Sequence, residues 1–189
     1  MVKKFERLKR TVLRKSNILE YCNDTLKLPN GNIREYDMMV HKGAAAVVPV
    51  MDDGGILMVR QYRPAIDRVT LEIPAGGRDS TDEPYEAAAR RELEEETGYR
   101  AGKMTHLITI DTAIAYCDER IEVFLAEKLT KTKQHLDEDE FIEYCVCRLP
   151  DLVAMIGRGE IRDSKTISSI LAMEHYCTNA GDKNWGRNA

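Results

Sequence analysis

Alternating apolar and polar positions, broken by turn signals, divide the chain into short strands and helices. The segment from Ala44 to Met51 is almost wholly apolar, which is typical of a buried strand. The turn-forming residues 52–55 lead into a second apolar run from Ile56 to Tyr62, and we expect the two runs to form a β-turn-β pair in the core sheet. The same patterns predict further strands at 69–73, 104–110, 120–127 and 141–147, and helices at 84–97, 149–157 and 163–177.

The residues before this core form a separate region. Asn30 and Gly31 tolerate positive φ and give the strongest short turn signal in the chain, so residues 8–41 are predicted to be an antiparallel hairpin module. The predicted organisation is an N-terminal β module at 1–42, a main domain at 43–178 and a polar tail at 179–189. Strands and helices alternate irregularly in the main domain, which indicates the α+β class with a mixed sheet between helices.

The composition narrows the possible functions of this chain of 189 residues. Hydrophobic residues make up 43% and charged residues 32%, as in ordinary globular proteins, and the net charge of -4 argues against binding to duplex DNA or RNA. An acidic protein that binds phosphates therefore needs a local cation. Five cysteines without a C-x-x-C pair argue against a disulfide framework or a zinc site, and the sequence predicts neither a signal peptide nor a membrane span. We therefore expect a cytoplasmic protein that has no nucleic-acid or membrane partner.

The most informative segment is the acidic end of the helix predicted at 84–97. Glu92, Glu95 and Glu96 occupy positions i, i+3 and i+4, so their carboxylates share one face. The simplest interpretation is a solvated charged face. Against it, like charges repel at this spacing, and carboxylates in a last helical turn oppose the helix dipole at about 0.3–1 kcal/mol each. A carboxylate cluster suits a hard divalent cation, so the segment also predicts a metal site.

Two arginines lie within pairing distance of these glutamates along the helix. Arg91 is four residues before Glu95, so the two side chains can pair. Glu94 points to the opposite side of the helix, where Arg90 is four residues earlier and can pair with it.

The spacing pattern extends over residues 77–99. Gly77, five residues, Glu83 and seven further residues lead to the run R-E-L-E-E-E-T-G-Y, which begins at Arg91. This segment resembles the Nudix box, G-x5-E-x7-R-E-U-x-E-E-x-G-U, at every defined position, where U is a bulky apolar residue. The flanking segments 59–63 and 71–76 extend the resemblance over most of residues 44–175.

Membership of the Nudix family implies an α/β/α sandwich and an enzyme that splits a nucleoside diphosphate from a second moiety. It also implies magnesium, or manganese as a substitute, which neutralises the diphosphate and acidifies a bound water. Arg91 would orient the carboxylate of Glu95, and Glu83 would steady the loop before the helix or assist with the metal. By position, the implied metal ligands are Glu92, Glu95, Glu96 and the backbone carbonyl of Gly76 or Ala75.

An acidic loop at 136–141 supplies candidates for the general base. Taken alone, it is most simply a solvated loop. In ADP-ribose pyrophosphatases, however, a loop of this kind has two glutamates two residues apart, and Glu138 and Glu140 match that spacing. The resemblance therefore implies that one of them is the base that takes a proton from the attacking water and the other a further metal ligand. Of the two assignments, we expect Glu138 to be the base and Glu140 the metal ligand.

Three features resemble the ADP-ribose pyrophosphatase branch of the family. They are the N-terminal module, the segments 61–64 and 71–76, and the triplet 118–120 that leads into a strand. This branch implies a homodimer formed through the module, with ADP-ribose as the substrate and AMP and ribose 5-phosphate as the products. By the same analogy Arg63 and Glu72, and more weakly Arg60, contact the substrate, although a surface ion pair explains Arg63 equally well.

One departure from that branch leaves the substrate open. The branch usually has a proline about fifteen residues beyond its box, whereas the segment 112–117 has none. GDP-mannose or another nucleotide sugar is therefore an alternative substrate, and Tyr116 could stack on its base, although a packed loop tyrosine is the simpler interpretation. A rival from a different class is a Nudix module that binds a nucleotide sugar as a sensor without hydrolysing it. That rival is disfavoured because the glutamates of the box are intact.

Overall fold

The computed structural model describes residues 1–138 and 140–179, and within them the chain forms three β-sheets, three α-helices and one 3-10 turn. All but the first residue of the predicted polar tail at 179–189 lies outside the described residues. None of the described helices is long and apolar enough to cross a membrane. In chain order the elements are β1 (Glu6–Lys15), β2 (Leu19–Lys27), β3 (Ile33–His41), β4 (Ala44–Pro49), β5 (Ile56–Arg63), η1 (Pro64–Ile66), β6 (Arg68–Glu72), β7 (Ala75–Gly77), α1 (Tyr85–Thr97), β8 (Tyr99–Asp111), β9 (Arg120–Lys131), β10 (Ile142–Cys147), α2 (Leu149–Gly157) and α3 (Ser164–Asn179).

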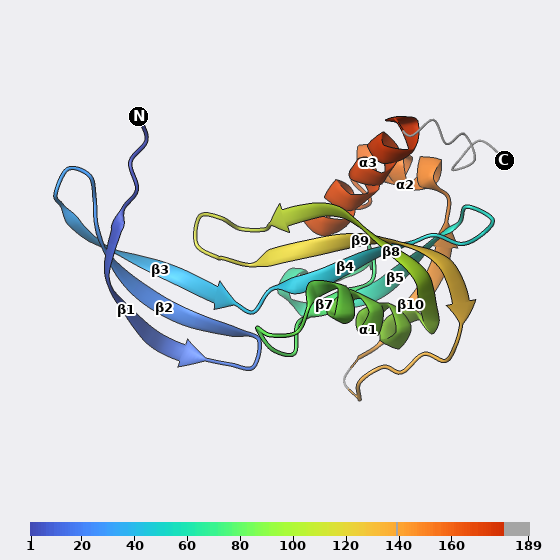
Figure 1. Cartoon of the computed structure of the whole chain (residues 1–189), viewed down its shortest axis with the longest axis horizontal. Helices are drawn as coiled ribbons and strands as arrows, with labels where there is room; N and C mark the ends of the chain where they lie inside the picture. Colours follow the sequence, from blue (N-terminus) through green and yellow to red (C-terminus); the bar gives the residue numbers. More distant parts are fainter. Residues whose placement is uncertain (139, 180–189) are drawn as a thin grey trace.

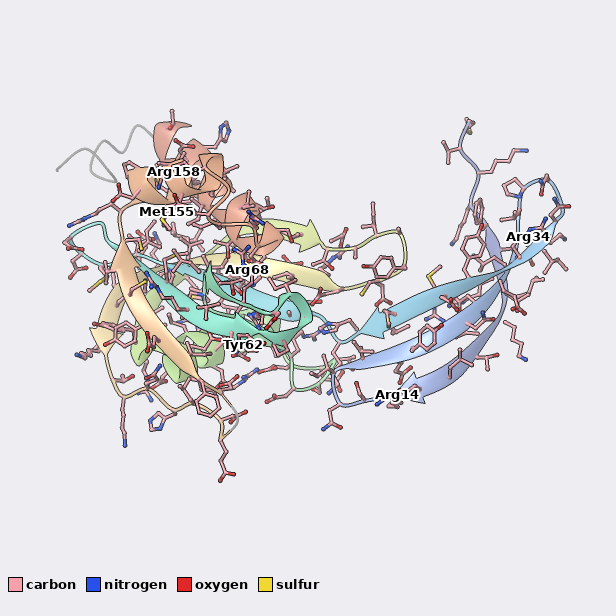
Figure 2. All side chains as sticks on the ribbon, turned by 180° about the vertical axis from the view of Figure 1, so that it is seen from behind. Arg14, Arg34, Tyr62, Arg68, Met155 and Arg158 are labelled. Atoms are coloured by element: carbon pink, nitrogen blue, oxygen red, sulfur yellow. The ribbon has the colours of Figure 1, made fainter. Side chains whose placement is uncertain are left out.

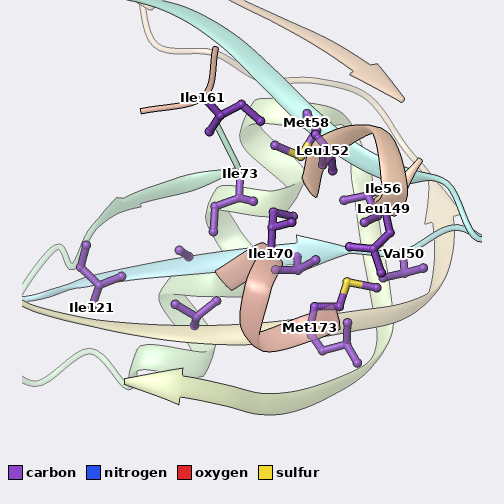
Figure 3. Close-up of a cluster of buried hydrophobic side chains, with 14 of the residues drawn as sticks. Val50, Ile56, Met58, Ile73, Ile121, Leu149, Leu152, Ile161, Ile170 and Met173 are labelled. Carbon is purple, nitrogen blue, oxygen red and sulfur yellow. The ribbon is translucent and has the colours of Figure 1, made fainter. Parts of the chain in front are cut away.

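A four-stranded mixed sheet with the order β7-β4-β9-β8 forms the centre of the main domain. Strand β4 runs parallel to β9 and antiparallel to β7. Helix α1 packs on one face of the sheet, where Ala45 and Val47 contact Leu93, and helices α2 and α3 pack on the other. Figure 3 shows Ile170 and Met173 of α3 beside this second face. Both faces of β4 are covered, which explains its unbroken apolar run and confirms the expected α/β/α sandwich.

The predicted β-turn-β pair does not lie in one sheet. The turn 52–55 joins β4 to β5 as expected, but β5 belongs to a second, antiparallel sheet with the order β10-β5-β6. Only an isolated bridge between Val50 and Ile56 connects the two strands. They diverge because the edges of β5 pair with β10 and β6, while Ile56 and Met58 still pack into the same core as Val48.

Several predicted boundaries also change. Strand β8 begins at Tyr99 rather than at 104, directly after the helix-ending Gly98, and its first residues are polar on their exposed side. Residues 75–77 form a short strand, whereas the sequence indicated only the end of a strand there. Pro84 is the N-terminal cap of α1 and not its first helical residue.

The N-terminal module is a separate antiparallel sheet with the order β1-β2-β3 and projects from the main domain (Figure 1). It consists of two hairpins, and the predicted Asn30-Gly31 turn joins β2 to β3, with Gly31 at φ 86°. The end of β3 attaches the module to the main domain, because the backbone of Met39 bonds to Tyr116 at 2.6 Å and to Asp118 at 3.2 Å.

Candidate active site

Helix α1 carries the acidic segment and ends where the sequence predicts. Its Ala, Arg and Glu residues favour helix, and Gly98 ends it in the left-handed conformation, with φ 70° and its N–H bonded to the carbonyl of Glu94. A Cβ at Gly98 would lie 2.7 Å from the backbone nitrogen of Gln134. Glycine is thus required at this position both by the backbone conformation and by the close approach of the loop that follows β9.

Glu92, Glu95 and Glu96 form one face of α1, which we call the acidic face. Glu92 and Glu96 are its buried members, with 8% and 3% of their surface exposed. Burial raises the pKa of Glu92 to about 7, although the neighbouring charge of Arg91 opposes the shift. Burial also raises the pKa of Glu96 to about 8, and the negative charge of Glu92 adds to it. Among the described residues, Glu96 has no cation within ion-pair distance, whereas Glu92 pairs with Arg91 at 2.7 Å and its pKa is raised in spite of that contact.

Arg91 is the centre of a hydrogen-bond network that fixes the rest of the box. It donates to the carboxylates of Glu83 at 3.2 Å, Glu92 at 2.7 Å and Glu95 at 3.0 Å, and to the carbonyl of Gly77 at 3.0 Å. Its contact with Glu95 is the pairing expected from the sequence. Glu83 also accepts a hydrogen bond from the backbone N–H of Asp79 at 2.7 Å, so it braces the loop before the helix.

The second predicted pairing on α1 is wrong. Arg90 bonds to Glu86 at 3.0 Å and to the carbonyl of Ala101 at 2.8 Å. Glu94 pairs instead with Arg100 at 2.7 Å, because β8 turns back beside the end of the helix. Glu94 nevertheless points away from the acidic face, as the helical spacing requires.

The backbone of β7 closes the acidic face on one side. A Cβ at Gly76 would lie 2.1 Å from the carboxylate carbon of Glu92, so any larger residue there would displace the end of that side chain. The N–H of Ala75 donates to Glu96 at 3.1 Å. The structure thus places the two candidates for a backbone metal ligand directly beside the buried carboxylates.

The loop after β9 closes the opposite side. Its backbone and side chains bond to the carbonyls at the end of α1, with Gln134 donating to Glu96 at 2.7 Å and the N–H of His135 donating to Glu95 at 3.0 Å. No sequence pattern indicated a role for Gln134. Farther along the loop, Glu140 is close enough for its charge to add to the raised pKa values of Glu92 and Glu96, after the larger effect of burial.

Of the two glutamates predicted in this loop, the structure brings only Glu140 to the acidic face. Glu138 is exposed, and Asp139 lies outside the described residues. The assignment of Glu138 as the base therefore stays a prediction.

The donor set fits a hard divalent cation. It consists of carboxylate oxygens and nearby backbone carbonyls, and the carboxylates of Glu92 and Glu96 are buried with raised pKa values. Among the described residues, no three acidic, histidine or cysteine side chains are already gathered as a chelate. Two effects explain this: Arg91 holds Glu95 and Glu92, and like charges separate when no cation lies between them.

A second polar cluster lies where β5, β6 and α3 meet. Arg63 makes a two-bond contact with Glu72, at 2.8 and 2.6 Å, and Lys165 of α3 donates to the same carboxylate. Thr70 donates to it at 2.5 Å. Glu72 is only 2% exposed, and these donors lower its pKa to about 2 although burial alone would raise it. Glu72 thus positions Arg63, while Arg63 itself borders an open pocket of about 600 Å³.

The remaining substrate candidate, Arg60, is not part of this cluster. Arg60 and Arg63 are three residues apart on β5, so their side chains leave opposite faces of the strand. Arg60 does not line the pocket that Arg63 borders. Sequence reasoning did not identify Lys165. Asp163, just before α3, accepts a hydrogen bond from the backbone N–H of Thr166 at 2.9 Å.

Comparisons with known proteins agree with this fold and with the motif. The sequence matches the model of the NUDIX domain over residues 40–169. It is 41% identical to the ADP-ribose pyrophosphatase of Bacillus subtilis (strain 168), over 81% of this chain and 83% of that protein. It is 37% identical to the methanol dehydrogenase activator of Bacillus methanolicus, over 78% and 80% of the two chains. The chain therefore belongs to the Nudix family, and it is a hydrolase of that family.

A solved structure of an ADP compounds hydrolase has the same fold. Its TM-score is 0.83, at 22% sequence identity, and the match covers 96% of this chain and 98% of that chain. The coverage includes nearly the whole chain, so the N-terminal module as well as the Nudix domain has a counterpart there.

Proposed function

We propose that this Nudix hydrolase splits the diphosphate of ADP-ribose and releases AMP and ribose 5-phosphate, with Mg²⁺ as its metal and Mn²⁺ as a possible substitute. The observation that carries the proposal is the buried acidic face of α1. There Glu92 and Glu96 have raised pKa values, and the missing side chain of Gly76 leaves space for the carboxylate of Glu92. The similarity to an ADP-ribose pyrophosphatase over most of both chains supports this choice of substrate.

Some residues at the acidic face would bind the metal ion, and others would position its ligands. Glu92, Glu96 and Glu140, together with Glu95 and the carbonyl of Gly76 or Ala75, are the groups that would hold the ion. A bound Mg²⁺ would neutralise the charge on the diphosphate and acidify a bound water. Arg91 keeps the carboxylate of Glu95 in place. Glu138 is proposed to take a proton from the attacking water. The oxygen of that water bonds to phosphorus while the bridging P–O bond breaks.

The substrate side of the proposal rests on Arg63. Its contact with Glu72 uses Nε and Nη2, which leaves Nη1 to donate to a phosphate or a sugar hydroxyl. Glu72 acts through Arg63, because it is buried and both of its oxygens already accept hydrogen bonds. Arg60 is the weaker candidate, since it lies on the other face of β5.

A substrate panel with a matched pair of variants tests this function. The full-length protein would be incubated with Mg²⁺ and ADP-ribose, GDP-mannose, ADP-glucose, NADH and nucleoside triphosphates, and products would be separated by chromatography. We expect ADP-ribose to give AMP and ribose 5-phosphate fastest. We expect Glu95→Gln to lower kcat by about 100-fold, several kcal/mol being typical of metal-dependent charge stabilisation. Glu94→Gln, the adjacent position on the opposite side of α1, should leave kcat within about twofold.

The outcomes separate the alternatives. Preference for GDP-mannose or another nucleotide sugar would keep the chemistry and change the substrate. Tight binding of one compound without cleavage would favour a sensor. Turnover that survives Glu95→Gln at saturating Mg²⁺ would show that the metal site is wrongly placed.

We also propose that the protein is a cytoplasmic homodimer formed through its N-terminal module. In support, the five cysteines are free thiols, and the module exposes several large apolar side chains. Those on β1 and its flanks are Phe5, Leu8, Val12, Leu13 and Ile18. Sedimentation equilibrium of the whole chain tests the dimer, and a monomer at micromolar concentration would contradict it.

A further inference from the structure

The pocket beside Arg63 is more positively charged than an acidic protein would suggest. It has a volume of about 600 Å³, which is within the range of small-molecule sites, and lies where η1, β6 and the start of α3 meet. The whole chain has a net charge of -4. The charged side chains that line the pocket are the cations Arg63, Arg68, Arg162 and Lys165 and the carboxylates Glu72 and Asp163.

Both carboxylates are already paired inside the wall. Glu72 is bound by Arg63 and Lys165. Asp163 accepts hydrogen bonds from Lys165 at 2.9 Å and from the hydroxyl of Thr166 at 2.6 Å. These contacts balance the charges of Arg63 and Lys165. The other two cations of the pocket are arginines without a carboxylate partner.

Arg68 and Arg162 are those two arginines. Arg68 donates to the carbonyl of Glu160 at 3.4 Å, and Arg162 donates to the carbonyl of Gly159 at 2.8 Å. Neither guanidinium has a carboxylate within ion-pair distance in the part of the chain that the structure describes. Hydrogen bonds to carbonyls do not neutralise a guanidinium, so an anion in the pocket would meet two positive charges.

Arg63 links the pocket electrostatically to the acidic face of α1. Arg63 lines the pocket, and the positive charge of Arg63 also acts on the carboxylate of Glu96. In Figure 2, Arg68 lies between the helices and the strand that carries Tyr62, whereas Arg158 lies at the end of α2. A molecule whose diphosphate lies at the acidic face could therefore extend past Arg63 into the pocket. Ala65 and Ile66 give the pocket an apolar wall that suits the face of a sugar.

We propose that this pocket is a subsite for a further phosphate on the substrate, bound by Arg68 and Arg162. The preferred substrates would then be nucleoside diphosphate sugars that carry an additional phosphate on one of their sugars. This proposal rests on the proposed function for its diphosphate chemistry and extends it by naming a subclass of substrate. Two arginines without carboxylate partners are what phosphate recognition requires, and nothing else in the wall neutralises them.

The test compares substrates that differ by one phosphate. The probes are ADP-ribose, ADP-ribose with a phosphate on carbon 1 of its terminal ribose, and ADP-ribose with a phosphate on the adenosine 2′-oxygen. Initial rates would be measured for the full chain and for Arg162→Gln, Arg68→Gln and Arg158→Gln. Arg158 is the matched control, because it also lies near α3 but pairs with Glu160 and does not line the pocket.

We expect at least one phosphorylated compound to have a higher kcat/KM than ADP-ribose. The ratio of the two kcat/KM values should fall by about tenfold or more in Arg162→Gln and Arg68→Gln, since each loses one charge-assisted bond, and should not change in Arg158→Gln. Equal ratios in the wild type and in all three variants would overturn the proposal.

Calorimetry without metal separates this proposal from the proposed function. Binding of a phosphorylated compound that weakens in Arg162→Gln, without any hydrolysis when Mg²⁺ is added, would support the phosphate subsite and contradict the proposed hydrolytic function. Hydrolysis of ADP-ribose with no preference for a phosphorylated compound would support the proposed function and contradict the phosphate subsite. Inorganic phosphate that binds in an Arg162-dependent manner, while no phosphorylated substrate is preferred, would make the pocket a site for free phosphate and overturn the substrate subclass.

Discussion

Glu72 and Glu96 are both almost fully buried glutamates of the same domain, yet their pKa values move in opposite directions. Burial alone would raise both. Glu72 accepts hydrogen bonds from Arg63, Lys165 and Thr70, and its pKa falls to about 2. Glu96 accepts one from the N–H of Ala75 and faces the negative charges of Glu92 and Glu140, and its pKa rises to about 8.

The difference shows that neighbouring charges, and not the extent of burial, decide whether the pKa of a buried carboxylate is raised or lowered. Glu72 has its cations supplied by the chain, so it stabilises the fold and positions Arg63. Glu96 has none of comparable strength, so the folded protein favours its protonated form until a cation arrives. A buried acid with a raised pKa next to other acids is typical of functional sites.

The largest expected effect is on the stability that Glu72 supplies. Glu72→Gln removes the buried charge that Arg63 and Lys165 share. It should lower the free energy of unfolding by about 2–3 kcal/mol, less than for a fully buried pair, because Arg63 is 38% exposed and Lys165 keeps its contact with Asp163. Urea denaturation followed by circular dichroism measures this. Glu86→Gln is the control, because Glu86 forms an exposed i, i+4 pair with Arg90 that should contribute less than about 0.5 kcal/mol. Equal losses in the two variants would contradict the contrast drawn between Glu72 and Glu96.

The same substitution at Glu96 should leave the stability of the metal-free protein intact and lower its activity. Glu96→Gln removes a charge that the metal-free fold does not balance, so the free energy of unfolding in EDTA should stay the same or rise. The rate of ADP-ribose hydrolysis at saturating Mg²⁺ should fall by about 100-fold or more. Parallel urea titrations and initial rates measure the two quantities. A variant that is both active and destabilised would place Glu96 with the structural acids.

The sequence contained most of the acidic face because that face is local. Helical spacing alone put Glu92, Glu95 and Glu96 together, and the resemblance over residues 77–99 added Arg91 and the requirement for a glycine before the helix. The structure adds Gly76, one residue before the glycine of that pattern, where the backbone lies against the carboxylate of Glu92. Features that depend on neighbours within a few residues were therefore predictable.

What the sequence did not reveal depends on contacts between distant segments. Lys165 meets Glu72 across 93 positions, and no local pattern reports such a pair. The separation of β4 and β5 into two sheets follows from their pairing with β9 and β10, which lie far along the chain. The N-terminal polar end of β8 had no apolar alternation to mark it, because Arg100 and Lys103 there pair with Glu94 and Glu127 on the surface.

The smallest expected effect, and the most direct test of the contrast, is the pH dependence of stability without metal. Glu92 and Glu96 have folded pKa values of about 7 and about 8, above the ordinary 4.5. Between pH 4.5 and 8 the folded state then binds more protons than the unfolded state, so stability falls as pH rises through this window. Glu72 has a lowered pKa, and its contribution is lost only below about pH 4.5, outside the window.

We therefore expect the Tm measured in EDTA to be lower at pH 9 than at pH 6 by about 4 °C or more, since 1 kcal/mol shifts Tm by about 2–4 °C for a chain of this size. The matched scan is Glu96→Gln, in which one of the two titrating groups is removed and the drop should shrink. Saturating Mg²⁺ should also shrink it in the wild type, because a bound cation replaces the proton in neutralising the carboxylates. An identical pH slope in the wild type and in Glu96→Gln would mean that the buried acids of α1 are balanced after all, as Glu72 is.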